Sequence, residues 1–141
     1  IHLRLNKYKL IHTVEIPQIL DDCLLYFAQQ PEHIPFKVKR IYFIMRANNK
    51  FIRGLHAHKK TRQIFFCIQG TIKLLLDNGT KKEEILLDKP NIGVLLEKMI
   101  WHQMSEFKKD TILLVLASRK FSEKDYIRSY EQFKKQIGKI S

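Results

Sequence analysis

The sequence predicts an all-β protein, an antiparallel sandwich or barrel, that ends in a short helix. Apolar and β-branched segments recur about every 8–12 residues with turn residues between them, which is typical of such folds. Asp77, Asn78 and Gly79 mark a tight hairpin, because Asn-Gly adopts positive φ at little cost. Only the segment from Ser122 onward departs from this β pattern.

The strands follow from this alternation in chain order. Short apolar alternation at Leu3, Leu5, Tyr8 and Leu10 predicts one or two strands near the N-terminus, ended by Pro17. The continuous run L-L-Y-F-A at residues 24–28 favours a buried strand, and 29–35 is a connection. Further strands are predicted at residues 36–45, around the histidine pair that follows, and at 63–68, 71–76, 82–87, 94–96, 100–104 and 112–118.

The C-terminal segment carries the signals of a helix. Ser122 followed three residues later by Asp125 resembles a capping box. Tyr126, Tyr130, Phe133 and Ile137 have the spacing of one apolar helical face. We therefore predict a helix at about residues 122–137 that packs on the barrel.

Length and composition indicate a single domain over residues 1–141, with short N-terminal strands in 1–30 and the barrel in 34–118. Hydrophobic residues make up 45% and charged residues 28%, a balance that argues against disorder. No apolar run approaches the roughly 20 residues that span a bilayer, and the N-terminus lacks a signal-peptide layout. Two cysteines do not support a disulfide framework, so a cytoplasmic location without a membrane partner is expected.

The formal net charge of +12 is compatible with nucleic acid, an anionic membrane surface or a phosphorylated small molecule. The Lys and Arg residues are scattered, mostly where turns or solvated faces are expected, so the simplest interpretation is surface charge. Nucleic acid is not an expected partner, because the aromatic residues fall inside strands and no basic helix exists. The excess of positive charge still suits a substrate that bears a diphosphate.

The most informative stretch runs from residue 53 to residue 70. His56 and His58 are two apart, which on a strand places both imidazoles on one face. Together with Gly54, Gln63 and Gly70 they resemble the first sequence motif of cupins, in which Glu usually stands where this chain has Gln63. Two imidazoles with pKa values near 6.5 can serve as a proton base and a proton donor.

His102 lies where cupins place a second motif whose histidine completes a metal site. Three histidines with Gln63 form a plausible ligand set for zinc, nickel or iron. The usual carboxylate is absent, however, so the positive charge of a divalent ion is less well neutralised. A site with no metal is therefore favoured, with His102 near the substrate or capping the barrel edge.

Four further residues are candidates for substrate binding. Arg40 and Tyr42 share one face of a predicted strand, and Arg53 precedes the histidines. Guanidinium groups grip a diphosphate bidentately, and a phenol hydroxyl can bond a sugar hydroxyl or a developing enolate; simple surface exposure is the alternative. Trp101, the only tryptophan, is either a core residue or a stacking wall for a base or sugar ring.

Four motifs in order resemble the sugar-nucleotide 3,4-ketoisomerases of the cupin superfamily. They are I-P-F-K-V-K-R-I-Y-F-I at 34–44, R-G-L-H-A-H-K-K at 53–60, L-L-V-L-A-S at 113–118 and D-Y-I-R-S-Y-E-Q-F at 125–133. The resemblance implies a double-stranded β-helix, the cupin jelly-roll barrel, that needs no metal or other cofactor and is usually a homodimer. It also implies an isomerase that moves the keto group of dTDP-4-keto-6-deoxyglucose from C4 to C3. The product would feed an aminotransferase that makes a 3-amino sugar for surface glycans such as lipopolysaccharide.

The family pattern implies that His56 and His58 carry the proton transfer. We expect His56 to remove the C3 proton and return it at C4 through an enediol, and His58 to bond the sugar oxygens. The reverse assignment fits the sequence almost as well. Arg53 and neighbouring cations would stabilise the enediolate.

Two other functions stay open at this point. One is a sugar-nucleotide 3,5-epimerase, although related cupins of that kind use a single histidine with an acidic partner. The other is a non-catalytic cupin that binds a small molecule. The chain also departs from the ketoisomerase pattern at Asp21–Leu25, where members commonly carry Arg-Gly. If that Arg helps to hold the nucleotide, either another cation does so in this chain or the N-terminal strand is arranged differently.

Overall fold

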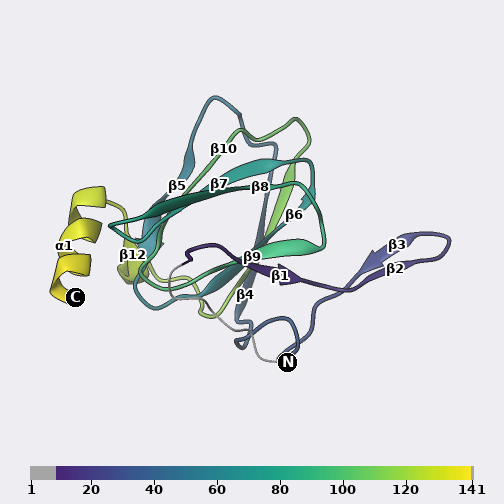
Figure 1. The fold of residues 1–141 in the computed structure, drawn as a ribbon, viewed down its shortest axis with the longest axis horizontal. Coiled ribbons are helices and arrows are strands. Elements are labelled where there is room, and N and C mark those ends of the chain that lie inside the picture. Colours follow the sequence, from purple (N-terminus) through teal and green to yellow (C-terminus); the bar gives the residue numbers. More distant parts are fainter. Residues whose placement is uncertain (1–8, 141) are drawn as a thin grey trace.

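Two antiparallel sheets face each other in the computed structural model, which describes residues 9–140 (Figure 1). The first sheet has the order β1-β9-β6-β11-β4, formed by His12–Glu15, Ile92–Leu96, Gln63–Gln69, Ile112–Ala117 and Arg40–Met45. The second has the order β12-β5-β10-β7-β8, formed by Tyr126–Ile127, Arg53–His58, Trp101–Ser105, Ile72–Asp77 and Lys82–Leu87. The predicted all-β barrel is thereby confirmed.

Two small elements flank the barrel at opposite ends of the view in Figure 1. One is the hairpin of β2 (Gln18–Leu20) and β3 (Leu24–Tyr26). The other is the C-terminal helix α1 (Tyr130–Ile140). No helix in the part of the chain that the structure describes has the length and apolar character needed to cross a bilayer.

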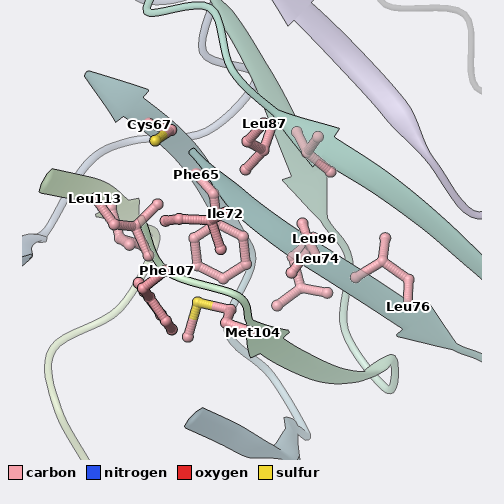
Figure 2. Close-up of a cluster of buried hydrophobic side chains, with 12 residues drawn as sticks. Phe65, Cys67, Ile72, Leu74, Leu76, Leu87, Leu96, Met104, Phe107 and Leu113 are labelled. Carbon is pink, nitrogen blue, oxygen red and sulfur yellow. The ribbon is translucent and has the colours of Figure 1, made fainter. Parts of the chain in front are cut away.

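The space between the sheets is filled by apolar side chains from both of them. Figure 2 shows this cluster around Phe65 of β6, with neighbours from β7, β8, β9, β10 and β11. Its members are Phe65, Cys67, Ile72, Leu74, Leu76, Leu87, Val94, Leu96, Met104, Phe107, Leu113 and Val115. Alternate residues of β6 point the other way, where Ile64 and Phe66 pack under Val14 and Ile34. Burial on both faces explains why β6 is a continuous apolar run.

The C-terminal helix packs on the outer face of the second sheet. Phe133 is fully buried there against Ala57, Trp101 and Ile127. The hydroxyl of Tyr130 donates a hydrogen bond to Oδ2 of Asp77 at 2.7 Å. The predicted packing of a C-terminal helix against the barrel is confirmed.

The predicted start of that helix at about residue 122 was wrong. Residues Glu123–Asp125 form a 3₁₀ turn, and the hydroxyl of Ser122 makes no capping hydrogen bond. Tyr126 and Ile127 then form the short strand β12, paired with His58 and Ala57 of β5. The backbone N–H and C=O groups of this segment form hydrogen bonds with the edge of β5, so they are not available for the hydrogen bonds of a helix.

Two strand predictions also need correction. The strand predicted at 36–45 begins only at Arg40. The segment predicted as a buried strand at 24–28 is the exposed hairpin strand β3, in which Leu24 and Leu25 are about half accessible. An apolar run predicts an extended segment but cannot say what covers it. The strand signal at Leu3 to Tyr8 lies outside the described residues.

Candidate active site

Strand β5 presents its histidines through a β-bulge. In the ladder with β10, His102 lies opposite His56 and Gln103 lies opposite Gly54, so Leu55 is the extra residue. Gly54 and Leu55 both have positive φ, 84° and 57°. A side chain at Gly54 would place its Cβ 3.0 Å from the carbonyl oxygen of His102. Glycine therefore lets β5 approach His102 closely, beside the ring of His56.

A cavity of about 420 Å³ opens beside this bulge. Five predicted site residues line it: Arg40 and Tyr42 from β4, Arg53 and His56 from β5, and His102 from β10. The cavity thus joins an edge strand of the first sheet to two strands of the second. It adjoins a second cavity of about 590 Å³, with which it shares Ile44, Arg53 and Gly54.

His56 lies at the centre of the histidine cluster. Its ring centroid is 4.4 Å from that of His102 and 4.9 Å from that of His58. Its Nδ1 donates a hydrogen bond to the carbonyl oxygen of Gly54 at 2.9 Å, which leaves the lone pair on Nε2. Burial lowers the pKa of His56, against the effect of the Gly54 carbonyl. The ring is therefore a neutral base at physiological pH.

His58 is buried behind His56 and does not line the cavity. Its Nδ1 lies 3.1 Å from Oδ2 of Asp125. Burial and the neighbouring His56 lower the pKa of His58 to about 4, although Asp125 acts in the opposite direction. Burial also holds the pKa of His102 well below its ordinary value. All three rings are accordingly uncharged at neutral pH.

The three histidines do not converge as a metal site. Among the described residues, the only group of three possible ligand atoms within 4.8 Å of one another is Asp21, Asp22 and Cys23, exposed at the tip of the β2–β3 hairpin. The rings of His58 and His102 are 6.3 Å apart. The three histidines of the predicted ligand set, which also included Gln63, therefore do not bring three ring nitrogens within 4.8 Å of one another.

Arginine and tyrosine side chains line the cavity beside the histidines. Nε of Arg40 is buried without a hydrogen-bond partner among the described residues, and its guanidinium lies 5.5 Å from the ring centre of Tyr42. Burial raises the pKa of Tyr42 to about 12, although the nearby amide of Gln63 acts in the opposite direction. Tyr42 therefore remains a hydrogen-bond donor at any physiological pH. Arg53 is exposed at the junction of the two cavities.

Two predicted substrate contacts lie elsewhere. Trp101 faces outward from β10 and packs edge-on against Tyr130, with ring centres 5.3 Å apart, so it lies under α1 and does not line the cavity. Gln63 is fully buried in the barrel and does not line the cavity. Neighbouring strand positions point to opposite faces, and the sequence could not say which face of β10 the helix would cover.

Sequence reasoning missed the wall contributed by the C-terminal segment. Phe121, Tyr126 and Arg128 line the cavity, and the guanidinium of Arg128 lies 4.4 Å from the ring centre of Tyr126. Asp125 is buried beneath them and bonds His58. The motif D-Y-I-R was the available signal, but its assignment to a helix directed these side chains away from the site.

Fold and site together define a cupin, a small jelly-roll barrel with a histidine cluster at one mouth. Residues 6–138 match the family described as FdtA: WxcM-like, C-terminal, and the chain belongs to this family. It is 42% identical over 117 residues to the TDP-4-oxo-6-deoxy-alpha-D-glucose-3,4-oxoisomerase of Aneurinibacillus thermoaerophilus, covering 83% of this chain and 84% of the relative.

Solved structures of ketoisomerases share the whole fold. QdtA, a sugar 3,4-ketoisomerase from Thermoanaerobacterium thermosaccharolyticum in complex with TDP, is 31% identical with a TM-score of 0.89, covering 93% of this chain and 96% of QdtA. WlaRA, a TDP-fucose-3,4-ketoisomerase from Campylobacter jejuni, is 34% identical with a TM-score of 0.86, covering 92% and 97%. The predicted cupin fold and the predicted relationship to 3,4-ketoisomerases are confirmed.

The epimerase alternative receives less support. ChmJ, a 3'-monoepimerase from Streptomyces bikiniensis, has a TM-score of 0.73 but is only 13% identical, over 84% of this chain and 68% of ChmJ. That likeness shows a common fold alone. The chain is an enzyme of the 3,4-ketoisomerase type.

Proposed function

We propose that the protein converts dTDP-4-keto-6-deoxyglucose to its 3-keto isomer in the cavity beside His56. The observation that carries this proposal is a neutral imidazole whose lone pair is on Nε2, set in a cavity lined by Arg40, Arg53 and Arg128. Proton removal next to a ketone needs a base of this kind and a positive environment for the enediolate.

In the first step, Nε2 of His56 takes the proton from C3. The electrons of that C–H bond form the C3=C4 double bond, and the carbonyl electrons of C4 move to O4. The O3 proton then passes to O4, the electrons on O3 form the new C3 carbonyl, and His56 returns its proton to C4. The proton count balances, so no reductant, oxidant or cofactor is consumed.

The oxygens of the enediolate would be held by Arg40 and Tyr42. A guanidinium with an unpartnered buried Nε is poised for an anionic oxygen, and a phenol with a pKa of about 12 donates without ionising. His102 lines the same cavity as an uncharged ring and would contact the sugar. We assign His58 a role behind His56, because it is buried and does not line the cavity.

The nucleotide would extend into the adjoining cavity of about 590 Å³, with Arg53 at the diphosphate. Arg53 lies at the junction of the two cavities, where a diphosphate between sugar and nucleoside must pass. The net charge of +12 favours the approach of such an anion. Arg53 would thus provide a positive charge for the diphosphate in a chain that lacks the Arg-Gly segment common near the N-terminus of family members.

We further propose a homodimer built on the outer face of β4. Ile41, Phe43 and Met45 alternate along this edge strand and are 61%, 63% and 51% exposed. The β2–β3 hairpin adds Ile19, Leu20, Leu24 and Leu25 as exposed apolar side chains. Surfaces of this kind mark association sites. A dimer by light scattering that a Phe43→Glu substitution converts to a monomer is the expected result; a monomeric wild-type protein would contradict it.

The proposed reaction also indicates how its product is used and where in the cell the protein acts. The 3-keto product is the form on which an aminotransferase would build a 3-amino sugar for surface glycans. Cys23 and Cys67 are both free, which is compatible with the reducing cytoplasm. We also propose that residues 1–141 act as a single domain.

The decisive experiment is proton NMR of dTDP-4-keto-6-deoxyglucose with EDTA-treated protein and with the His56→Asn and His58→Asn variants. A new 3-keto species, retained after chelation and lost with His56→Asn, is the expected result. The coupling constants of its ring protons also give the C4 configuration, galacto or gluco. An unchanged spectrum with the wild-type protein would reject the proposed function.

A further inference from the structure

The only ionisable acid buried against the histidine cluster, among residues 9–140, is Asp125, and the reaction as proposed does not use it. Its carboxylate accepts hydrogen bonds from three groups. These are Nδ1 of His58 at 3.1 Å, the backbone N–H of Lys60 at 2.7 Å, and the hydroxyl of Thr61. A carboxylate held by donors from both ends of the 58–61 turn is fixed in position.

The hydrogen bond to Asp125 determines which nitrogen of His58 carries the proton. Burial alone would raise the pKa of Asp125, but Thr61, Lys60 and His58 outweigh it and lower that pKa, so the group is an anion. An anionic carboxylate only accepts, and His58 must therefore carry its proton on Nδ1. Nε2 of His58 is then a bare acceptor, buried without a partner among the described residues.

His58 in turn contacts the base. Its ring meets that of His56 edge-on at 4.9 Å, with an interplanar angle of 84°. The other charged or titratable groups near His56 are Arg40 of β4, His102 of β10, and Glu123, Tyr126 and Arg128 of the C-terminal segment. Arg40 and Arg128 oppose a positive charge on His56, and Glu123 is exposed and paired with Arg128. The buried negative charge available to this cluster is that of Asp125.

We infer that Asp125 is a positioning residue for the isomerisation: through Nδ1 of His58 it fixes the tautomer of that ring and supplies the negative charge that lets the His56–His58 pair hold the abstracted proton. The inference rests on the proposed function. When the C3–H bond breaks, the proton moves to Nε2 of His56 and the pair gains one positive charge. Asp125 offsets that charge from behind the pair without touching the substrate.

The test compares wild type with Asp125→Asn, whose amide is neutral and can donate as well as accept. We expect kcat to fall by about 100-fold, within the range for general-base catalysis, with KM changed by less than about threefold. We also expect the acidic limb of kcat/KM to move to lower pH, because the imidazolium has lost its counter-charge. Asp110→Asn makes the same chemical change on an exposed turn and should match wild type.

A second measurement does not depend on a folded variant. The ¹⁵N shifts of His58 in the wild-type protein at pH 7 should report a proton on Nδ1 and none on Nε2. A proton on Nε2, or an unchanged pH profile and kcat in folded Asp125→Asn, would overturn the inference while wild-type isomerisation stands. Absence of isomerisation in the wild-type protein would instead reject the proposed function.

Discussion

The cavity has two walls that the fold holds in different ways. The strand wall carries Arg40, His56 and His102 on β4, β5 and β10, each part of a five-stranded sheet. The C-terminal wall carries Phe121, Tyr126 and Arg128 on a segment attached through a two-residue strand and the bonds of Asp125. The strand wall is thus part of the barrel, whereas the C-terminal wall depends on contacts made by a few residues.

The two walls therefore differ in the contacts that hold their side chains in position. Ladder hydrogen bonds hold the strand wall, because β5 and β10 are paired on both sides and β4 is paired with β11 on one side. The C-terminal wall needs an anchor beyond it, and α1 provides one through buried Phe133 and the Tyr130–Asp77 hydrogen bond. Substitutions in the strand wall should therefore lower catalytic activity with little change in stability. Substitutions under α1 should lower both the free energy of unfolding and catalytic activity.

Among substitutions that compare the two walls, the largest effect is expected for Arg40→Met, which keeps an unbranched side chain as far as the position of Nε and removes the guanidinium charge. Loss of one oxyanion donor typically lowers kcat by about 10²–10³-fold. Stability should change little, because the buried Nε of Arg40 has no hydrogen-bond partner to lose among the described residues and the guanidinium only lies over the rings of Tyr42 and Phe121. Steady-state kinetics with thermal unfolding measure both, with exposed Arg119→Met as control. An unchanged kcat would reject the proposal that Arg40 holds an oxygen of the enediolate.

Phe133→Ala should loosen the C-terminal wall from a distance. Removing a fully buried phenylalanine typically costs about 3–5 kcal/mol of unfolding free energy. We also expect kcat to fall, because α1 anchors the segment that bears Tyr126 and Arg128. Denaturant titration and kinetics test this, with exposed Lys135→Ala as the matched control. Full activity in a destabilised but folded Phe133→Ala protein would mean that the two walls are independent.

Acid should weaken the folded state through His58. In the unfolded chain this ring gains a proton below about pH 6.5, but in the folded protein its pKa is lowered to about 4. The stability that the neutral ring contributes is therefore present above pH 6.5 and is lost as the pH falls toward 4. Urea titrations across this window should show the decline, and His58→Gln should make it shallower, with His56 and His102 accounting for the rest. A wild-type curve that is flat over the same range would contradict the buried neutral ring.

The smallest effect is expected for Tyr130→Phe. The substitution removes the hydroxyl that bonds Asp77 and keeps the ring against Trp101, so about 1 kcal/mol of stability should be lost. The change should be confined to unfolding free energy, with kcat near that of wild type. A large loss of activity would show that the C-terminal wall tolerates no movement of α1.

Much of the strand wall was predictable because its polar residues are spaced two apart, which is the side-chain period of a β-strand. The pair His56 and His58 lies on one strand, Arg40 and Tyr42 on another, and alternation alone places each pair on one face. The contact between the rings of His56 and His58 agrees with that expectation, and so does the cavity that Arg40 and Tyr42 both line. The hairpin at Asn78–Gly79 likewise follows from local backbone preference.

The C-terminal wall was not predictable, because its conformation is decided by a partner far away in the chain. Residues 122–129 carry helical signals, yet the unpaired edge of β5 captures Tyr126 and Ile127 as a strand. The sequence by itself determined an all-β barrel, a pair of histidines on one strand and a set of cations. Only the tertiary structure decided that Trp101 supports the helix, that His58 lies behind His56, and that Asp125 reaches His58 across 67 residues. Local preference is worth tenths of a kcal/mol to about 1 kcal/mol per residue, so a long-range strand pairing or a buried hydrogen bond can override it.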